Sequence, residues 1–249
     1  MANWSDPRIG AGAQPTTTAG RDVAFDAGLR AHMLSVYNYM ASGVLLTGII
    51  ALFFARGGTE SIAFRIATQG GPLIWLVMLS PLAIVFAMSF GVNRFSTGTL
   101  RIMYWVYAAL MGVSLSTIFL VYDIGSVATA FFATSAGFAG LSLWGYTTKR
   151  DLSGMGTFLV MGLFGLIAAM LITALIPGEN PAVTMAISVV GLLIFAGLTA
   201  YDTQKIKSLY FEVAGTDYVG KAVVMGALTL YLDFINMFLF ILRLFGNRN

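Results

Sequence analysis

Two aspartates near the end of the chain are the residues best placed to do chemistry. Asp233 lies inside residues 222–242, AVVMGALTLYLDFINMFLFIL, an otherwise uncharged run that is long enough to cross a bilayer. Asp202 follows directly on the preceding apolar run, residues 181–201. A charged side chain near the middle of a bilayer costs about 2.5 kcal/mol or more, so it normally faces a protein interior or a water-filled path. The two carboxyl groups therefore predict a site that handles protons or cations.

The chemistry expected of this pair depends on whether the two carboxyl groups meet. Two carboxylates in a water-poor pocket repel each other, so together they would hold one proton near neutral pH. With that proton, a short hydrogen bond joins the two helices; without it, the like charges push the helices apart or bind a cation. Calcium prefers oxygen ligands but takes about 6 to 8 of them, so Asp202 and Asp233 alone would bind it only transiently.

Each of these residues also has a purely structural interpretation. A protonated Asp233 can join neighbouring helices by a hydrogen bond alone, and Asp202 can be solvated at the membrane boundary with Lys205 one turn away as its ion-pair partner. Asn236 lies three residues after Asp233 on the same helical face, where we expect it to orient the carboxyl group. Arg94, at the end of the second apolar run, is a candidate countercharge, although a boundary arginine commonly extends to lipid headgroups.

Seven apolar runs must position these residues. Each approaches the ~20 residues that cross a ~30 Å hydrocarbon core as a helix, and helix is the structure that satisfies the backbone of so long a run in lipid. The runs are residues 33–54, 73–92, 102–122, 126–146, 155–177, 181–201 and 222–242. We predict an all-α polytopic membrane protein, with a seven-helix bundle over residues 33–246 and a polar, flexible segment at residues 1–32.

The runs differ in composition and in where they place the aspartates. Ala, Ser and Gly are frequent in the fourth, fifth and sixth runs, which predicts that these helices pack closely and form the centre of the bundle. If each helix begins and ends with its apolar run, Asp233 lies eleven residues into its span, about 17 Å, whereas Asp202 lies at the end of the previous one. Contact between them then requires a shifted or tilted helix.

The composition excludes several classes of protein. With 58% hydrophobic and 10% charged residues, against roughly 25% charged in soluble domains, the chain is not a soluble globule. Its net charge of +3 is dispersed over short loops, which argues against nucleic-acid binding. There is no cysteine, and His32 is the only histidine, so thiol catalysis and a paired-histidine zinc site are excluded, and neither HExxH nor GxSxG occurs. We expect no enzyme and no cofactor.

The basic residues predict the orientation of the chain in the membrane. With seven spans the two ends lie on opposite sides, and Lys and Arg accumulate in cytoplasmic loops. Ten of them fall on the side of the N-terminus and four on the side of the C-terminus. We therefore expect a cytoplasmic N-terminus and an external C-terminus.

Two stretches in the last third of the chain carry a specific pattern. They are GLTAYDTQKIK at residues 197–207 and LTLYLDFINMFLFILRLFG at residues 228–246. In order and spacing the chain resembles the Bax inhibitor-1 family, also called the transmembrane Bax inhibitor motif family. The resemblance implies seven helices and, for bacterial members, a pH-sensitive calcium leak governed by a hydrogen-bonded aspartate pair, whose positions fall on Asp202 and Asp233. A second-span arginine proposed to exchange partners with the first aspartate falls near Arg94.

These observations together predict a function. We expect a multi-pass protein of a bacterial inner membrane that passes calcium or another cation down its gradient, with Asp202 and Asp233 as a proton-controlled latch and transient ligand. The main alternative is a regulatory protein that transports nothing and binds other membrane proteins, such as a membrane-anchored protease; Asp233 would then only join helices. A proton-coupled carrier is a third alternative.

Overall fold

Helices account for nearly all of the described residues. The computed structural model describes residues 18–69, 71–176, 178 and 180–248. Its elements are α1 (Thr18–Ala55), η1 (Gly58–Glu60), α2 (Ile62–Gln69), α3 (Pro72–Gly91), α4 (Thr97–Leu115), α5 (Ile118–Val121), α6 (Ile124–Thr147), α7 (Ser153–Leu175), α8 (Pro181–Val213) and α9 (Val219–Phe245). Within the described residues, seven spans are long and apolar enough to cross a membrane, which confirms the predicted all-α, seven-span architecture.

Some helix boundaries differ from those of the apolar runs. Helix α1 begins at Thr18, so part of the predicted polar segment is helical, and residues 1–17 lie outside the described part of the chain. The third run divides into α4 and the single turn of α5. Helix α8 extends twelve residues past residue 201, to Val213. This extension is amphipathic, because Ile206 and Val213 are buried while Lys205 is exposed. An apolar run therefore stops at residue 201 although the helix continues.

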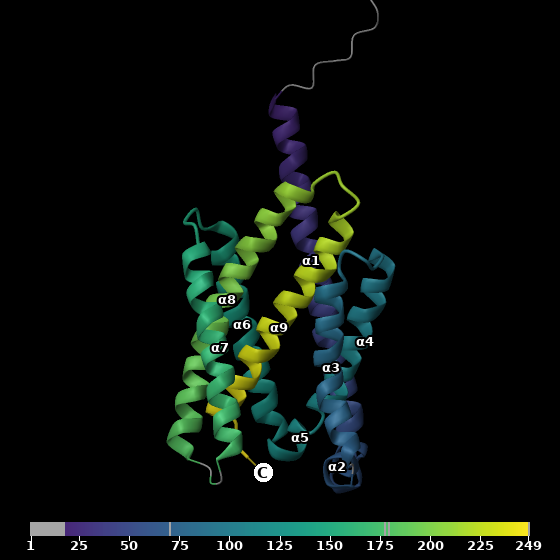
Figure 1. Cartoon of the computed structure of the whole chain (residues 1–249), viewed down its shortest axis with the longest axis vertical. Coiled ribbons are helices and arrows are strands. Elements are labelled where there is room, and N and C mark those ends of the chain that lie inside the picture. Colours follow the sequence, from purple (N-terminus) through teal and green to yellow (C-terminus); the bar gives the residue numbers. More distant parts are fainter. Residues whose placement is uncertain (1–17, 70, 177, 179, 249) are drawn as a thin grey trace, which may run out of the picture.

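Helix α9 forms the centre of the bundle. In Figure 1 it crosses the molecule between α6, α7 and α8 on one side and α1, α3 and α4 on the other. In the 18-residue apolar stretch of α9, 72% of the residues are buried, against 11% in that of α7 and 22% in that of α6. The prediction that the fourth, fifth and sixth runs form the centre was therefore wrong, since α8, the helix of the sixth run, is 33% buried by the same measure. Their small residues mark close pairwise contacts instead: Gly145 packs on the backbone of Ala200, and Gly156 packs on the ring of Tyr201.

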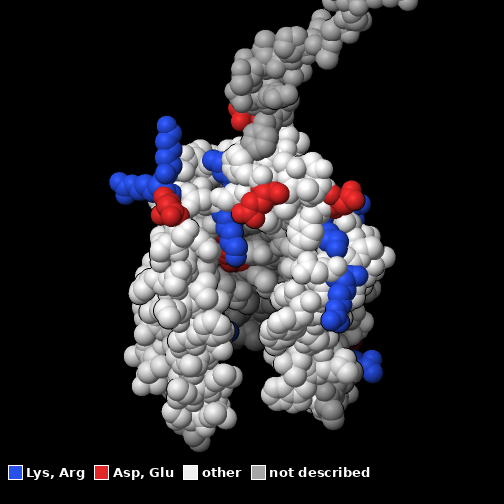
Figure 2. All heavy atoms as spheres, turned by 45° about the horizontal axis from the view of Figure 1, so that its top comes forward, with Lys and Arg blue, Asp and Glu red and all other residues white. Residues whose placement is uncertain are grey.

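The two ends of the molecule differ. The α3–α4, α6–α7 and α8–α9 connections lie at the end where α1 begins, and the C-terminus lies at the other end (Figure 1). Figure 2 shows charged side chains gathered at the first end and a furrow that divides the face below it. The long apolar flanks between the ends suit a lipid environment.

Candidate functional site

The hairpin of α8 and α9 brings the two aspartates to the same depth. Asp202 lies 11 residues before Val213, where α8 ends, and Asp233 lies 14 residues after Val219, where α9 begins. At 1.5 Å per residue these positions are about 17 Å and 21 Å from the connection. The extension of α8 beyond residue 201 thus makes the contact that the apolar runs alone did not allow.

The side chains of Asp202 and Asp233 hydrogen-bond to each other. Asp233 is 3% exposed, and Asp202 is half-buried. Because an ionised carboxylate only accepts hydrogen bonds, a bond between two carboxyl groups requires a proton on one of them. The Oδ2 atom of Asp233 is buried with no hydrogen-bond partner, so the pair retains an acceptor for a proton, a water molecule or a cation.

A cavity of about 600 Å³ opens onto both aspartates. Its walls come from α3, α4, α7, α8 and α9, and its lining is largely apolar. Pro81, the proline inside α3, lines one wall, and Arg243, near the end of α9, lines the cavity at the C-terminal side. The cavity therefore extends from the aspartate pair towards the end of the molecule where the chain terminates.

The residues predicted to support the pair occupy different positions. Lys205 is close enough to Asp202 for a favourable Coulomb interaction, and its Nζ lies 5.9 Å from the centroid of the Tyr201 ring. Asn236 lines the same cavity as Asp233, but its amide donates to the carbonyl oxygen of Leu232 at 2.8 Å.

Arg94 does not lie with the aspartates. It is exposed in the turn after α3 and is absent from the cavity lining. The basic residue that contacts this turn is Lys221, whose Nζ donates to the carbonyl oxygen of Val92 at 3.0 Å. As a countercharge for Asp202, Arg94 would need a different conformation of this turn.

A chain of hydroxyl groups next to Asp202 was not predicted from the sequence. The Tyr37 hydroxyl lies 2.6 Å from Ser142 Oγ, which lies 3.0 Å from Thr203 Oγ1. This chain ties α1, α6 and α8 together directly beside the aspartate. Tyr107 was also missed: its buried hydroxyl lines the aspartate cavity and has no hydrogen-bond partner. Isolated Tyr, Ser and Thr residues in apolar runs are too common to mark such positions.

The oxygen atoms around the pair are few. Within the described residues no group of three or more His, Cys, Asp and Glu side chains could hold a metal ion. A calcium ion at Asp202 and Asp233 would therefore need further ligands from water or from uncharged side chains of the cavity, such as Asn236.

The family model described as "Inhibitor of apoptosis-promoting Bax1" matches residues 29–249. The chain belongs to the Bax inhibitor-1 family. An uncharacterised protein of Rickettsia prowazekii is 45% identical over 233 residues, which cover 93% of this chain and 96% of that protein. Inner membrane protein YbhL of Escherichia coli is 42% identical over 224 residues, covering 89% and 94%. A protein of Caulobacter vibrioides is 42% identical over 234 residues, covering 90% and 92%.

These relatives bear out the resemblance found in the sequence. All three are bacterial proteins aligned over at least nine-tenths of their own length, so the chain is a bacterial member of the Bax inhibitor-1 family. The match begins at residue 29, close to the start of the first candidate span at Asp26.

Proposed function

We propose that this protein is a proton-controlled leak for calcium or another cation in the inner membrane, without catalytic activity. The observation that carries the proposal is the carboxyl pair of Asp202 and Asp233, which lies deep between two spans and lines a cavity of about 600 Å³. An ionisable pair in that position costs stability, and such residues commonly mark ion or proton pathways. The E. coli relative is named an inner membrane protein, which supports the location.

The proton acts as a latch between α8 and α9 in this mechanism. While one carboxyl group is protonated, its hydrogen bond to the other holds the two helices together. When the proton leaves, two carboxylates face each other in poor contact with water, and their repulsion favours separation of the helices or entry of a cation. The same charges that open the path then attract the ion.

The cation would pass the pair rather than stay there. Two aspartates give a divalent ion strong attraction but few ligands, so binding is weak and release is fast. Arg243 lines the cavity on the C-terminal side, where its positive charge repels cations and limits the rate of entry. We further propose that the N-terminus is cytoplasmic, because ten of the fourteen Lys and Arg residues lie on its side.

The proposal is tested by calcium flux into proteoliposomes that contain the purified chain, measured at several pH values. Wild type should conduct, and its flux should rise as the pair loses its proton. A variant with both Asp202→Asn and Asp233→Asn should lose the pH dependence. If no flux occurs at any pH while the double variant is merely less stable, the protein is a regulatory binding protein; saturable exchange of calcium for protons would indicate a carrier.

A further inference from the structure

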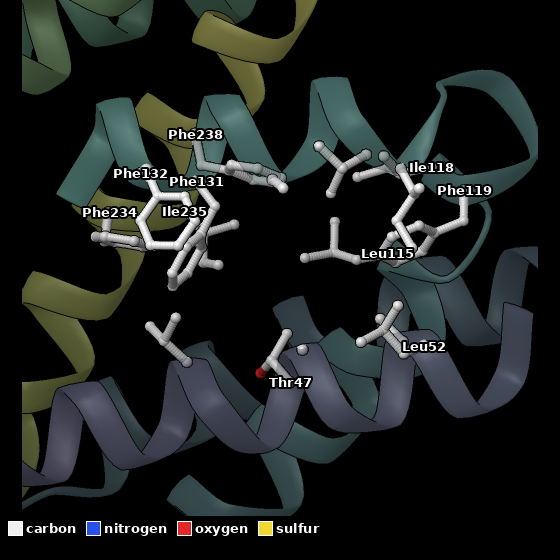
Figure 3. A pocket seen from close by; sticks show the side chains of 16 residues that line it. Thr47, Leu52, Leu115, Ile118, Phe119, Phe131, Phe132, Phe234, Ile235 and Phe238 are labelled. Atoms are coloured by element: carbon white, nitrogen blue, oxygen red, sulfur yellow. The ribbon is translucent and has the colours of Figure 1, made fainter. Parts of the chain in front are cut away.

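A second cavity, of about 380 Å³, lies between α1, α5, α6 and α9. In Figure 3 the labelled side chains of these helices surround an open space, with Thr47 and Leu52 on α1 and Phe234 and Phe238 on α9. Successive residues of a helix are separated by about 100°, so Phe234 and Phe238 project from α9 at roughly 100° and 140° from the direction of Asp233. The two cavities therefore lie on different sides of the central helix and share one lining residue, Ile235.

The wall of this cavity offers no polar group to a ligand. Thr47 provides the single polar side chain of the lining, and its hydroxyl donates to the carbonyl oxygen of Ala108 at 2.7 Å and accepts from Tyr231 at 2.6 Å. A buried water needs 2 to 4 hydrogen-bond partners, whereas apolar cavities stay dry and take up apolar molecules. An engineered cavity of about 150 Å³ holds benzene, so this one has room for a longer hydrocarbon.

The cavity lies at the depth of one leaflet of the membrane. On α1 its lining runs from Val44 to Leu52, and the first candidate span ends at Ala55. At 1.5 Å per residue the lining lies about 5 to 17 Å inside that end of the span. Half of a ~30 Å hydrocarbon core is about 15 Å, so the cavity lies beside the acyl chains of the leaflet on the C-terminal side.

The opening of the cavity faces sideways, towards those chains. Its rim is formed by exposed apolar side chains, Leu52, Ile124 and Phe132, and its floor by the buried Phe234 and Phe238. A rim without charges on the flank of a membrane-spanning helix bundle opens into hydrocarbon, not into water.

We propose that this cavity is a binding site for one acyl chain of a phospholipid from that leaflet. The chain enters over the rim and displaces no water, and each buried methylene contributes about 0.8 kcal/mol relative to water but far less relative to lipid. Specificity therefore comes from the fit of the chain between the phenylalanines. Since the occupied wall includes Phe234 and Phe238 of α9, a bound chain restrains the helix that carries the aspartate.

Glycine positions provide a matched pair of variants. Gly48 lines the cavity, and a Cβ atom at this position would meet no atom within 4 Å. Gly48→Leu therefore fills the cavity without a clash at the backbone. Gly165→Leu makes the same change in α7, also in open space, at an exposed position away from this cavity. Ala128→Leu fills the cavity from α6 and is the second cavity-filling variant, to be used if Gly48→Leu does not fold.

The test uses the full chain in vesicles of phosphatidylcholine that carries a photoactivated diazirine in the middle of one acyl chain. After irradiation, mass spectrometry should find label on Phe234 or Phe238, which line this cavity but not the aspartate cavity and are buried beyond the reach of lipids at the outer surface. Gly48→Leu or Ala128→Leu should lower this labelling about fivefold or more, as a loss of ~1 kcal/mol of contact would, and Gly165→Leu should leave it unchanged.

Two results would overturn the proposal. One is label confined to exposed side chains such as Leu76 and Phe158, with no decrease in the cavity-filling variants. The other is a protein that runs as a dimer with Phe234 and Phe238 unlabelled, which would make the occupant a second copy.

Discussion

The carboxyl group of Asp202 contacts that of Asp233 across the α8–α9 hairpin, deep between its two ends. Helix α9 is the most buried span of the described chain, so any change at this contact acts on the centre of the bundle. The packing of α9 against its neighbouring helices and the protonation of the pair are therefore expected to depend on each other.

Thr47→Val should destabilise the protein by about 1 kcal/mol. The Thr47 hydroxyl joins the Ala108 carbonyl oxygen to the Tyr231 hydroxyl, and its loss leaves the buried Tyr231 hydroxyl unpaired. Thr134→Val is the control: Thr134 is equally buried, but its hydroxyl bonds only to the carbonyl oxygen of Ala130 in its own helix. Thermal unfolding in detergent should show a lower Tm for Thr47→Val, and equal Tm values for the two variants would contradict the role of Thr47.

Gly145→Ala should destabilise the contact between α6 and α8. A Cβ atom at Gly145 would overlap the carbonyl oxygen of Ala200, and a backbone atom cannot move aside as a flexible side chain can. The expected loss is about 1–3 kcal/mol, typical of overpacking. Gly140→Ala, five residues away in the same helix and in open space, gains helix propensity instead and should not lose stability. A Tm of Gly145→Ala at or above that of Gly140→Ala would refute this packing.

The sequence predicts the seven spans well because each contains a long apolar run, and lipid leaves such a run only one structure. It predicts poorly where a helix continues with one polar face. Helix α8 runs on from residue 201 to Val213 through a segment, DTQKIKSLYFEV, that mixes polar and apolar residues, with Ile206 and Val213 on the buried side. That continuation decides where Asp202 lies relative to Asp233, so helix counting alone separated two residues that are in contact.

The positions of the supporting residues depend on tertiary packing and were less predictable. Asn236 does lie on the cavity side of α9, as its spacing from Asp233 predicts, but its amide bonds to Leu232 instead. Arg94 is displaced from the pair because α3 ends before it and the chain turns there. No local pattern in the sequence predicts the hydrogen bond of Asn236 or the position of Arg94.

The N-terminal cap of α6 should be lost at acidic pH. Hydrogen bonds from Ser126, through its Oγ at 2.5 Å and its backbone N–H at 3.0 Å, hold the pKa of Asp123 below its usual value of 3.8. A lowered pKa in the folded chain stabilises it fully above the unfolded value and loses this effect as the pH falls through the folded pKa. The cap should therefore be constant near neutral pH and open only below about 3.8.

Hydrogen exchange checks this cap, because the same turn holds the C-terminal segment. Asp123 donates its backbone N–H to the Asn247 carbonyl oxygen at 3.3 Å, and Asn247 donates its own to Ser126 Oγ at 2.9 Å. Asp123→Ala should accelerate exchange at Asn247 and at Ser126. Asp123→Asn keeps an acceptor for the Ser126 N–H and should have a smaller effect. Equal exchange in the two variants and wild type would show that the cap contributes nothing.

Single cysteines should report the orientation of the chain, since the natural sequence contains none. Glu60→Cys lies between α1 and α2, and Lys149→Cys lies between α6 and α7; both positions are exposed. With a cytoplasmic N-terminus, a membrane-impermeant maleimide added to cells with a permeable outer envelope should label position 60 and reach position 149 only after the inner membrane is broken. The reverse pattern would invert the topology.

The central claim is that the Asp202–Asp233 pair couples protonation to ion passage, and the most direct measurement is the pH profile of calcium flux through Asp233→Asn in proteoliposomes. Asp151→Asn, a change of the same chemistry in the exposed α6–α7 connection, is the control and should retain the wild-type profile. We predict that Asp233→Asn gives the same flux at every pH, because its amide cannot take part in sharing a proton. A wild-type pH profile in Asp233→Asn would contradict the account.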